Sequence, residues 1–390
     1  MRRLLPTAAG LKHRIRHQYH RLQRYVDSKR KATAFSRWVN RFTTSQSEVL
    51  IGANFDRGGG VRNHIHSIAR YSAHSCLLIP DEPALSVLDY GFFIERSPQF
   101  QELNPPSSAK ILHSHVSPWY IDWCLQHRKN KQLRWIHTHH ALYFEDTEIG
   151  GLADWQKQLN KAGLQALRNC DLPLCVSPSQ QRALRTLFGV DSVFLPNGVD
   201  VQSCDLGVGL RFRRTFRIDR PFVLWMGRRE SVKNPSDILL AAAALPEVQF
   251  VVAVDCRDAE ELQVATGVAV PGNVLLPGPL SRAAAQDALA ACSLLVVTSL
   301  REGLPTLLLE ALAHRCQIVT SDAEGCLDAT DDGRLAAIYP RRNIAALCEC
   351  ISRAMRSPGP CERGRTYVLE KFDWKVVARK LDDYYSGRDG

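Results

Sequence analysis

The sequence has 390 residues, with 50 Lys and Arg against 40 Asp and Glu, so its formal charge is +10 at neutral pH while 45% of its residues are hydrophobic. This length predicts two or three domains with sizeable cores and excludes a collagen, a coiled coil or a knottin. The positive charge agrees equally with nucleic acid, an anionic membrane or a phosphorylated substrate as the partner.

The positive charge is concentrated at the N-terminus. Residues 1–42 contain twelve Lys or Arg and one acid, a net charge of +11, which leaves 38 basic and 39 acidic residues in the other 348. Apolar residues recur in this extension at helical spacing, with basic residues on the flanks. They form a stripe at Leu11, Ile15, Tyr19, Leu22 and Val26, followed by a second set at Phe35, Trp38, Val39 and Phe42.

Two interpretations of residues 1–42 stay open: a helix that docks its stripe on the rest of the protein, or a helix that lies on an anionic membrane leaflet. An Arg-rich transit peptide has a similar composition. We expect no binding of nucleic acid, because no recognition module accompanies the charge.

The sequence contains no apolar stretch long enough to span a membrane and no apolar core of a secretory signal. Its twelve cysteines are scattered through apolar runs without a Cys-x-x-Cys pair, which predicts free buried thiols, a reducing compartment and no zinc site. We therefore expect a cytoplasmic protein, peripheral at the inner face of the cytoplasmic membrane.

From Glu48 onward, short apolar runs alternate with helical patterns, which predicts parallel sheets covered by helices on both faces. A pause near residue 205 separates two doubly wound α/β halves. The expected strands of the first half are 49–55, 76–80, 109–115, 134–140, 172–177 and 192–198. Those of the second half are 222–227, 248–254, 274–278, 293–299 and 317–321. Ligands of such sheets bind beyond the carboxyl ends of the strands, so we expect the site in the cleft between the halves.

The segment SLREGLPTLLLEALAHRC, from Ser299, is the most informative. A loop containing Glu302 and Gly303 follows a predicted strand, and Pro305 suits the first turn of a helix that runs to about His314. Gly303 allows a ligand close to the backbone, and the free amides of the helix N-terminus favour an anion. Glu310, eight positions after Glu302, offers a second carboxylate that can accept hydrogen bonds from the vicinal hydroxyls of a sugar.

Cations follow the strand that opens the second half. Arg228 and Arg229 come directly after residues 222–227, and Lys233 precedes the next helix. Because the strands are parallel, these cations are expected beside the anion-binding helix terminus, where Arg228 and Lys233 could neutralise a diphosphate.

Taken together, these segments resemble family 4 glycosyltransferases, which are retaining enzymes of the GT-B fold. Glu302 and Glu310 match the family's Glu-x7-Glu signature, and Arg228 and Lys233 stand where the family has its diphosphate-binding cations. The resemblance extends over residues 48–386. It includes a glycine-rich loop at 56–64, a strand and turn at 195–200, and a terminal helix at 371–385.

The resemblance implies a domain plan. Residues 1–47 would be the basic amphipathic extension, 48–205 a Rossmann-like acceptor-binding domain, and 206–370 a Rossmann-like domain for the nucleotide sugar. Residues 371–390 would be a helix that crosses back to the first domain.

The resemblance also implies retaining transfer of a hexose from a UDP- or GDP-sugar to a saccharide or glycolipid acceptor, with lipopolysaccharide or polysaccharide biosynthesis as the expected setting. Catalytic roles would fall to His140, Arg228, Lys233 and Glu302. Glu310 would bind the ribose. The donor-binding set would be Gly59, Gly60, Arg228, Lys233, Gly303, Leu304, Pro305, Thr306 and Glu310. Since cations and a helix terminus already face the developing negative charge, and the chain has no Asp-x-Asp triplet, we expect no metal and no cofactor.

Three histidines stand together at 137, 139 and 140. With Glu145 and Asp146 they could form a metal site, but the resemblance gives His140, or alternatively His139, a place near the donor sugar. His113 and His115 are expected to be structural.

The sequence departs from the family in two places. The stretch SDAEGCLDATDDG, with Glu324, Gly325 and Asp328, replaces the family's Gly-Gly-x-x-Glu element, and the basic extension matches nothing in the shared core. Because a fold does not fix a function, an epimerase or phosphorylase on the same scaffold remains an alternative, as does a binding protein without activity.

Overall fold

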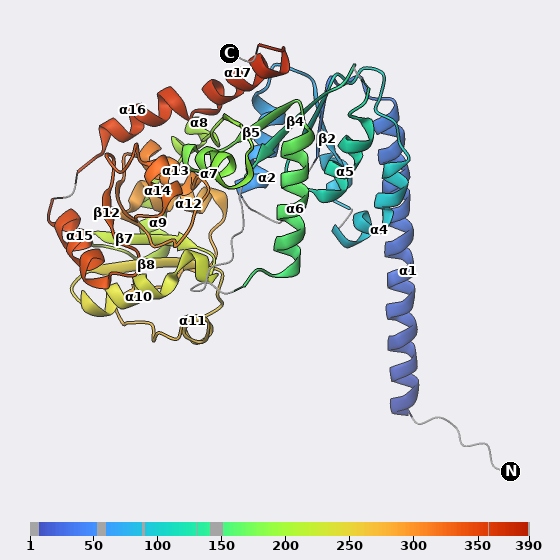
Figure 1. Ribbon diagram of the computed structural model, residues 1–390. Helices are drawn as coiled ribbons and strands as arrows, with labels where there is room; N and C mark the ends of the chain where they lie inside the picture. The colour runs from blue at the N-terminus through green and yellow to red at the C-terminus, as the bar shows by residue number, and fades with distance from the viewer. Residues whose placement is uncertain are drawn as a thin grey trace.

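The computed structural model describes residues 8–52, 60–87, 90–130, 132–140, 151–357 and 359–388, without the side chains of residues 8–25, 82, 85, 90 and 91. It contains two six-stranded sheets in which every strand pair is parallel (Figure 1). The predicted α/β fold class is therefore confirmed.

The first sheet has the order β2-β1-β3-β4-β5-β6. Its strands are β1 (Val49–Gly52), β2 (Cys76–Ile79), β3 (Ile111–Ser114), β4 (Arg134–His139), β5 (Leu172–Cys175) and β6 (Val193–Phe194). Its helices are α2 (Gly60–Tyr71), α3 (Glu82–Leu85), α4 (Tyr90–Gln101), α5 (Pro118–His127), α6 (Asp154–Asn169) and α7 (Pro178–Phe188). All six strands lie where the sequence predicts them.

The second sheet has the order β12-β11-β10-β7-β8-β9. Its strands are β7 (Phe222–Gly227), β8 (Gln249–Val254), β9 (Val274–Leu275), β10 (Leu294–Val297), β11 (Gln317–Ser321) and β12 (Ala337–Tyr339). Of these strands, β12 was not predicted from the sequence. The helices between and after these strands are α10 (Pro235–Ala244), α11 (Ala259–Thr266), α12 (Arg282–Ala291), α13 (Thr306–Ala313), α14 (Glu324–Ala329) and α15 (Ile344–Arg356), with a 3-10 turn, η1, at Ser231–Lys233.

The connection between the sheets contains α8 (Val201–Cys204) and α9 (Gly209–Phe216), so the predicted boundary near residue 205 falls within it. Strand order reverses beside β1 in the first sheet and beside β7 in the second. In a parallel sheet this reversal opens a crevice at the carboxyl ends of the flanking strands, which is where a ligand binds. In the second sheet the crevice lies between the ends of β7 and β10.

Two helices at the end of the chain, α16 (Glu362–Lys371) and α17 (Trp374–Tyr385), lead back from the second domain to the first (Figure 1). Trp374, Val377 and Leu381 of α17 pack in one core cluster with Val49 and Ile51 of β1. The C-terminal helix therefore completes the hydrophobic core of the first domain.

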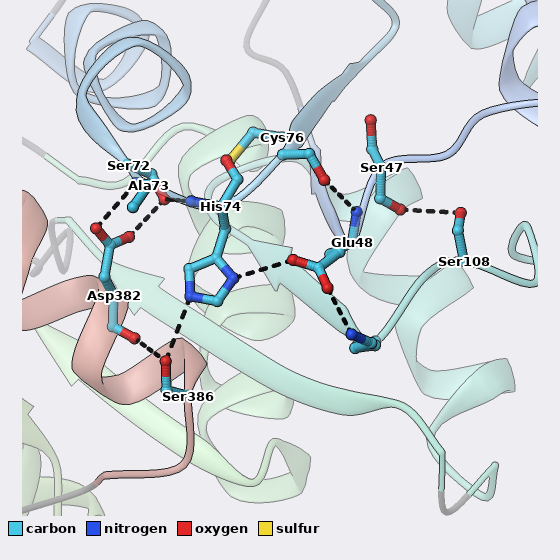
Figure 2. Close-up of polar contacts among 11 residues, drawn as sticks. Ser47, Glu48, Ser72, Ala73, His74, Cys76, Ser108, Asp382 and Ser386 are labelled. Carbon is cyan, nitrogen blue, oxygen red and sulfur yellow. Dashed lines mark hydrogen bonds and ion pairs between the residues drawn. The ribbon is translucent and has the colours of Figure 1, made fainter.

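Polar contacts fix the end of α17 to the first domain (Figure 2). The carboxylate of Asp382 accepts hydrogen bonds from the Ser72 hydroxyl at 2.5 Å and the Ala73 amide at 2.9 Å. His74 lies between Ser386 and Glu48, with its ring nitrogens 3.4 Å and 3.3 Å from their oxygens. The contacts of Asp382 and Ser386 join residues more than 300 positions apart in the sequence.

Helix α1 (Ala8–Thr43) is a single helix whose first half extends away from the body of the molecule (Figure 1). Phe35, Trp38 and Phe42, near its end, are buried with the aromatic residues of α4 and α5. The ring of Trp38, for example, lies 5.6 Å from that of Phe93 and 5.8 Å from that of Phe100. The second apolar set of the extension therefore belongs to the core of the first domain.

All twelve cysteines are free thiols, as predicted. No helix in the part of the chain that the structure describes combines the length and the apolar character needed to cross a bilayer.

Candidate active site

The crevice of the second sheet brings Lys233 and Glu302 together. Lys233 ends the short turn η1 after β7, and Glu302 lies in the loop after β10. The Lys233 ammonium lies 2.6 Å from Oε1 of Glu302, which also accepts a hydrogen bond from the Ser299 hydroxyl at 2.7 Å. Both side chains are mostly shielded from solvent, 27% and 12% exposed. This ion pair is thus fixed at the predicted ligand crevice.

Arg228 follows the last residue of β7 and is more exposed. Its guanidinium lies 3.0 Å from a carboxylate oxygen of Glu230, and 57% of its side chain is accessible to solvent. An exposed pair of this kind is weak, because water and salt screen it. Arg228 can therefore exchange Glu230 for a more highly charged anion at little energetic cost.

The loop between β10 and α13 packs tightly between the two domains. A Cβ atom on Gly303 would lie 2.7 Å from the carbonyl oxygen of His140, which follows β4 in the first domain. From the other side, a Cβ atom on Gly325 of α14 would lie 2.5 Å from the carbonyl oxygens of both Glu302 and Gly303. Only glycine fits at either position without moving backbone. The loop that carries Glu302 is therefore held in place by its backbone contacts.

Helix α13 begins directly after this loop. Pro305 is its N-cap rather than its first residue, and the helix spans Thr306–Ala313 with His314 as its C-cap, close to the predicted end. Leu304 is buried, and its carbonyl accepts a hydrogen bond from Asn197 of the first domain at 3.2 Å. The first amides of the helix have no acceptor within the helix, so its N-terminus can receive an anion.

Glu310 lies one turn further along α13 and is partly exposed. Its Oε2 accepts a hydrogen bond from the side-chain amide of Gln286 at 3.1 Å. Burial raises the pKa of the Glu310 carboxyl, while Arg282 and the Gln286 hydrogen bond oppose that rise. Glu310 was predicted from the sequence, but Gln286, which stands 24 positions earlier on α12, was not.

His140 belongs to a cluster of buried histidines at the carboxyl ends of the first sheet. Its Nε2 lies 3.0 Å from Nδ1 of His115, and its ring contacts the ring of His64 on α2 edge to face, with centroids 4.8 Å apart. Burial holds the pKa of His140 and of His115 well below 6.5, and that of His64 at about 3. These imidazoles are therefore neutral at physiological pH and can offer hydrogen bonds but no positive charge.

The other predicted histidines face different surroundings. His139 packs against Gly163 of α6, where a Cβ atom would lie 3.1 Å from its ring. His113 is buried between Tyr385 of α17 and Thr138, at 2.6 Å and 2.8 Å, which agrees with the expected structural role. Of the two histidines expected near a donor sugar, His140 and not His139 has its backbone against the loop that carries Gly303.

A cavity of about 60 Å³ lies beside these rings and is lined by His115, His137, His139 and His140, among others. The Nε2 atoms of His115, His137 and His139 have no partner among the described residues. A cavity of this size can admit water, which usually satisfies such buried nitrogens.

The metal hypothesis from the sequence joined His137, His139 and His140 to Glu145 and Asp146. Glu145 and Asp146 lie outside the described residues, and only His140 of the three predicted histidines belongs to the group that converges. His64, His115 and His140 bring one potential ligand atom each within 4.8 Å of one another. One short contact between His115 and His140 already joins two of these rings.

The glycine-rich loop can be placed only in part. Gly59 lies outside the described residues. Gly60 is the exposed first residue of α2, and nothing lies within 4 Å of the position its Cβ would take. The stretch that departs from the family has a clear place: Asp328 of α14 accepts a hydrogen bond from the Ser179 amide of α7 at 2.9 Å and thereby joins the two domains.

Two family models match the chain, one in each half. Residues 66–203 match the model described as Glycosyltransferase Family 4, and residues 210–370 match the one described as Glycosyl transferases group 1. The two matches follow one another along the chain and include most residues of the candidate site.

Curated relatives agree with these models. The chain is 22% identical to the phosphatidyl-myo-inositol mannosyltransferase of Mycobacterium leprae over 371 residues, which cover 85% of this chain and 94% of that protein. It is 26% identical to the putative teichuronic acid biosynthesis glycosyltransferase TuaC of Bacillus subtilis over 218 residues, which cover 55% of this chain and 54% of that one.

Among solved structures, HepE from Anabaena in complex with UDP and glucose superposes with a TM-score of 0.67 and 15% identity, covering 87% of this chain and all of that one. At this level of identity the likeness shows a common fold.

Proposed function

Because the chain belongs to family 4 of the glycosyltransferases and has the GT-B fold, we propose that it transfers a hexose from a nucleotide-diphosphate sugar to a hydroxyl group of a saccharide. We propose that the transfer retains the anomeric configuration. The acceptor would be lipid-linked or part of a cell-surface polymer, as in lipopolysaccharide or polysaccharide biosynthesis.

The observation that carries this proposal is the convergence of Lys233, Glu302 and the N-terminus of α13 at the crevice of the second sheet, against the His140 backbone of the first domain. Parallel α/β sheets bind ligands at this point. The name of the Mycobacterium leprae relative and the ligands of HepE agree with a lipid-borne acceptor and a nucleotide-sugar donor.

The chemistry follows from where negative charge appears. Cleavage of the bond between sugar and diphosphate leaves charge on the leaving phosphate. Lys233, Arg228 and the first amides of α13 would stabilise that charge more strongly in the transition state than in the ground state. An ammonium group has three donors and Glu302 uses one, so Lys233 can bind a phosphate without leaving its partner.

The remaining residues would orient the donor. Glu310 would accept hydrogen bonds from the ribose hydroxyls, while Glu302 and the Gly303 loop would lie near the hexose. His140 is neutral, so in this proposal it contributes hydrogen bonds to the donor sugar rather than charge. No step in this scheme requires a metal ion, and we expect activity in the presence of a chelator.

We also propose that α1 holds the enzyme against the anionic inner face of the cytoplasmic membrane. At 3.6 residues per turn, Val26 points about 150° away from the mean direction of Phe35, Trp38 and Phe42. Val26 is 58% exposed, whereas the three aromatic residues are buried in the body. The face of α1 that carries Val26 is thus directed away from the protein.

Basic residues share the outward face of α1. Arg30 and Arg37 lie within about 40° of Val26 around the helix. With Lys29 they line an open surface hollow of about 440 Å³, which Val87 also lines. An apolar residue beside arginines on an outward face is typical of a helix at an anionic lipid surface.

The proposed reaction can be tested by incubating the purified protein with UDP-, GDP- and ADP-hexoses, with and without saccharide acceptors, in the presence of EDTA. Transfer from one donor only when an acceptor is present supports the proposal. A change in the sugar nucleotide without an acceptor would instead indicate an epimerase. No turnover of any donor, with no binding of the nucleotides, would contradict the proposal.

A further inference from the structure

A short chain of hydrogen bonds lies behind Glu310. Gln286 of α12 is buried, with 4% of its surface exposed, and its Nε2 donates to Oε2 of Glu310 at 3.1 Å. Its Oε1 lies 2.7 Å from Nε2 of His314, the residue after α13. Gln286 therefore joins the end of α13 to a carboxylate on the same helix.

The donor and acceptor of each hydrogen bond in this series follow from the chemistry of the groups at its two ends. An ionised carboxylate can only accept hydrogen bonds, so Gln286 must present its NH₂ group to Glu310. Its carbonyl oxygen then faces His314, whose Nε2 must carry a hydrogen and donate it. Burial lowers the pKa of His314 to about 4, so the ring is neutral and Nε2–H is the donor that the chain requires.

Other titratable groups surround both ends. Arg282 of α12 and Cys204 of α8 lie near Glu310. Around His314 stand Asp205, Asp287, Arg315 and Arg365, two acids and two bases. None of these groups is hydrogen-bonded to Glu310 among the described contacts, so Gln286 is the neighbour that fixes the carboxylate.

The linker between the domains packs against the residues of this hydrogen-bond chain. A Cβ atom at Gly207 would lie 2.6 Å from the backbone carbonyl oxygen of Gln286 and 2.8 Å from Cε1 of His314. Only a glycine permits this approach, which leaves Gln286 buried and His314 half-buried beside the linker. A shielded hydrogen bond to a charged group is stronger than an exposed one.

We propose that Gln286 is a positioning residue for nucleotide binding: it holds Oε2 of Glu310, leaves Oε1 to the ribose hydroxyls of the donor, and is itself oriented by His314. This inference rests on the proposed function, because it assigns Glu310 to the ribose. It adds two residues, neither of which touches the donor.

The test compares the binding of nucleotides with and without the ribose hydroxyls. Isothermal titration of the full-length protein with UDP and GDP identifies the better ligand, and its 2′,3′-dideoxy form is then titrated. Gln286→Leu is expected to weaken binding of the ribonucleotide about tenfold, the usual effect of losing a hydrogen bond to a charged group. Binding of the dideoxy nucleotide, which has no ribose hydroxyl for Glu310, should not change.

Matched variants complete the design. Gln263→Leu makes the same replacement at an exposed position of α11 and should change neither affinity. His314→Phe leaves the Gln286 amide free to turn and should weaken ribonucleotide binding, whereas His314→Gln keeps an N–H donor and should restore part of it.

The pH dependence supplies a second readout. The Gln286 hydrogen bond lowers the pKa of Glu310, so its loss raises that pKa further. Because the carboxylate form binds the hydroxyls, the loss of ribonucleotide affinity on acidification should begin at a higher pH in Gln286→Leu than in the wild type. The ligand phosphate titrates in the same way with both proteins, so its effect cancels when their pH profiles are compared.

The outcomes separate the inference from the proposed function. If Gln286→Leu weakens both nucleotides equally, Gln286 is only structural and the inference is wrong, while the proposed function stands. If the wild-type protein binds neither UDP nor GDP, the proposed function fails first. Equal affinity of wild type and Gln286→Leu for the ribonucleotide would also overturn the inference.

Discussion

The Lys233 ammonium lies 2.6 Å from Oε1 of Glu302, so the cation proposed to bind the diphosphate and the carboxylate proposed to lie near the hexose form one ion pair. Ser299 fixes the same carboxylate oxygen, and the backbone of Gly325 supports the loop that carries it. The charged centre of the crevice is thus arranged before a donor arrives. A site arranged in advance stabilises charge without reorganising at the moment of reaction.

Replacing Lys233 by Ala is expected to lower kcat/KM for the best donor by about 30- to 1000-fold, which corresponds to about 2–4 kcal/mol of transition-state stabilisation. The loss has two causes: the phosphate loses a cation, and Glu302 is left without its ion-pair partner near the leaving group. Steady-state transfer assays measure the effect. Lys129→Ala, at an exposed lysine after α5, is the control. Activity of Lys233→Ala within threefold of the wild type would contradict the assignment.

Replacing Gly303 by Ala should reduce transfer at least tenfold with little loss of folded protein. The new Cβ would lie 2.7 Å from the His140 carbonyl oxygen, and a backbone atom cannot move aside as a flexible side chain can. The loop must therefore shift, and Glu302 and the N-terminus of α13 shift with it. Gly272→Ala, where a Cβ would meet nothing within 4 Å, is a matched control. Full activity of Gly303→Ala would show that the loop position does not matter.

The sheets could be predicted from the sequence because buried parallel strands are near-continuous apolar runs, such as 222–227 and 249–254. The strand β12 was missed because its three residues give too short a pattern. Glu302, Glu310, Arg228 and Lys233 could be selected because each belongs to a local motif. Gln286 and His314 could not, because they are 28 positions apart and only the packing of α12 on α13 joins them.

In the N-terminal extension, too, the sequence did not predict contacts with distant parts of the chain. Its two apolar sets were visible in the sequence, but both interpretations applied to the whole extension. The structure divides it: Phe35, Trp38 and Phe42 enter a cluster with Phe93 and Phe100, which come much later in the chain. Periodicity predicts an apolar face but not the partner that covers it.

Removal of residues 1–28 should release the protein from anionic vesicles without affecting its stability. This deletion takes away the predicted stripe and seven basic residues but keeps the buried aromatic residues of α1. Deletion of residues 1–42 is a poorer test, because the loss of Trp38 alone should cost about 3–5 kcal/mol of folding free energy.

Co-sedimentation with vesicles of phosphatidylglycerol and phosphatidylcholine measures the release, and urea unfolding measures the stability. Vesicles of phosphatidylcholine alone serve as the uncharged control. Equal sedimentation of the full chain and the shortened chain with the anionic vesicles would refute membrane attachment through this helix.

The free energy of unfolding should fall as pH decreases below about 6.5. Six buried histidines have lowered pKa values: about 3 for His64 and His113, about 4 for His139, and well below 6.5 for His115, His137 and His140. In the unfolded chain these groups titrate near 6.5 and take up protons that the folded state does not bind. Their contribution to stability is therefore complete above 6.5 and is lost as pH falls through the interval down to the folded pKa values.

Between pH 7.5 and 5.5 each such histidine should lower the free energy of unfolding by about 1.4 kcal/mol. Even two of the six would therefore make the decrease measurable by urea unfolding. His139→Gln provides the internal check, because Nε2 of His139 has no partner among the described residues and the variant removes one titrating group. The free energy of unfolding of this variant should depend less steeply on pH than that of the wild type, because the variant takes up about one proton fewer on unfolding. Equal stability of the wild-type protein at pH 7.5 and 5.5 would show that these histidines are protonated, or reach water, in the folded state.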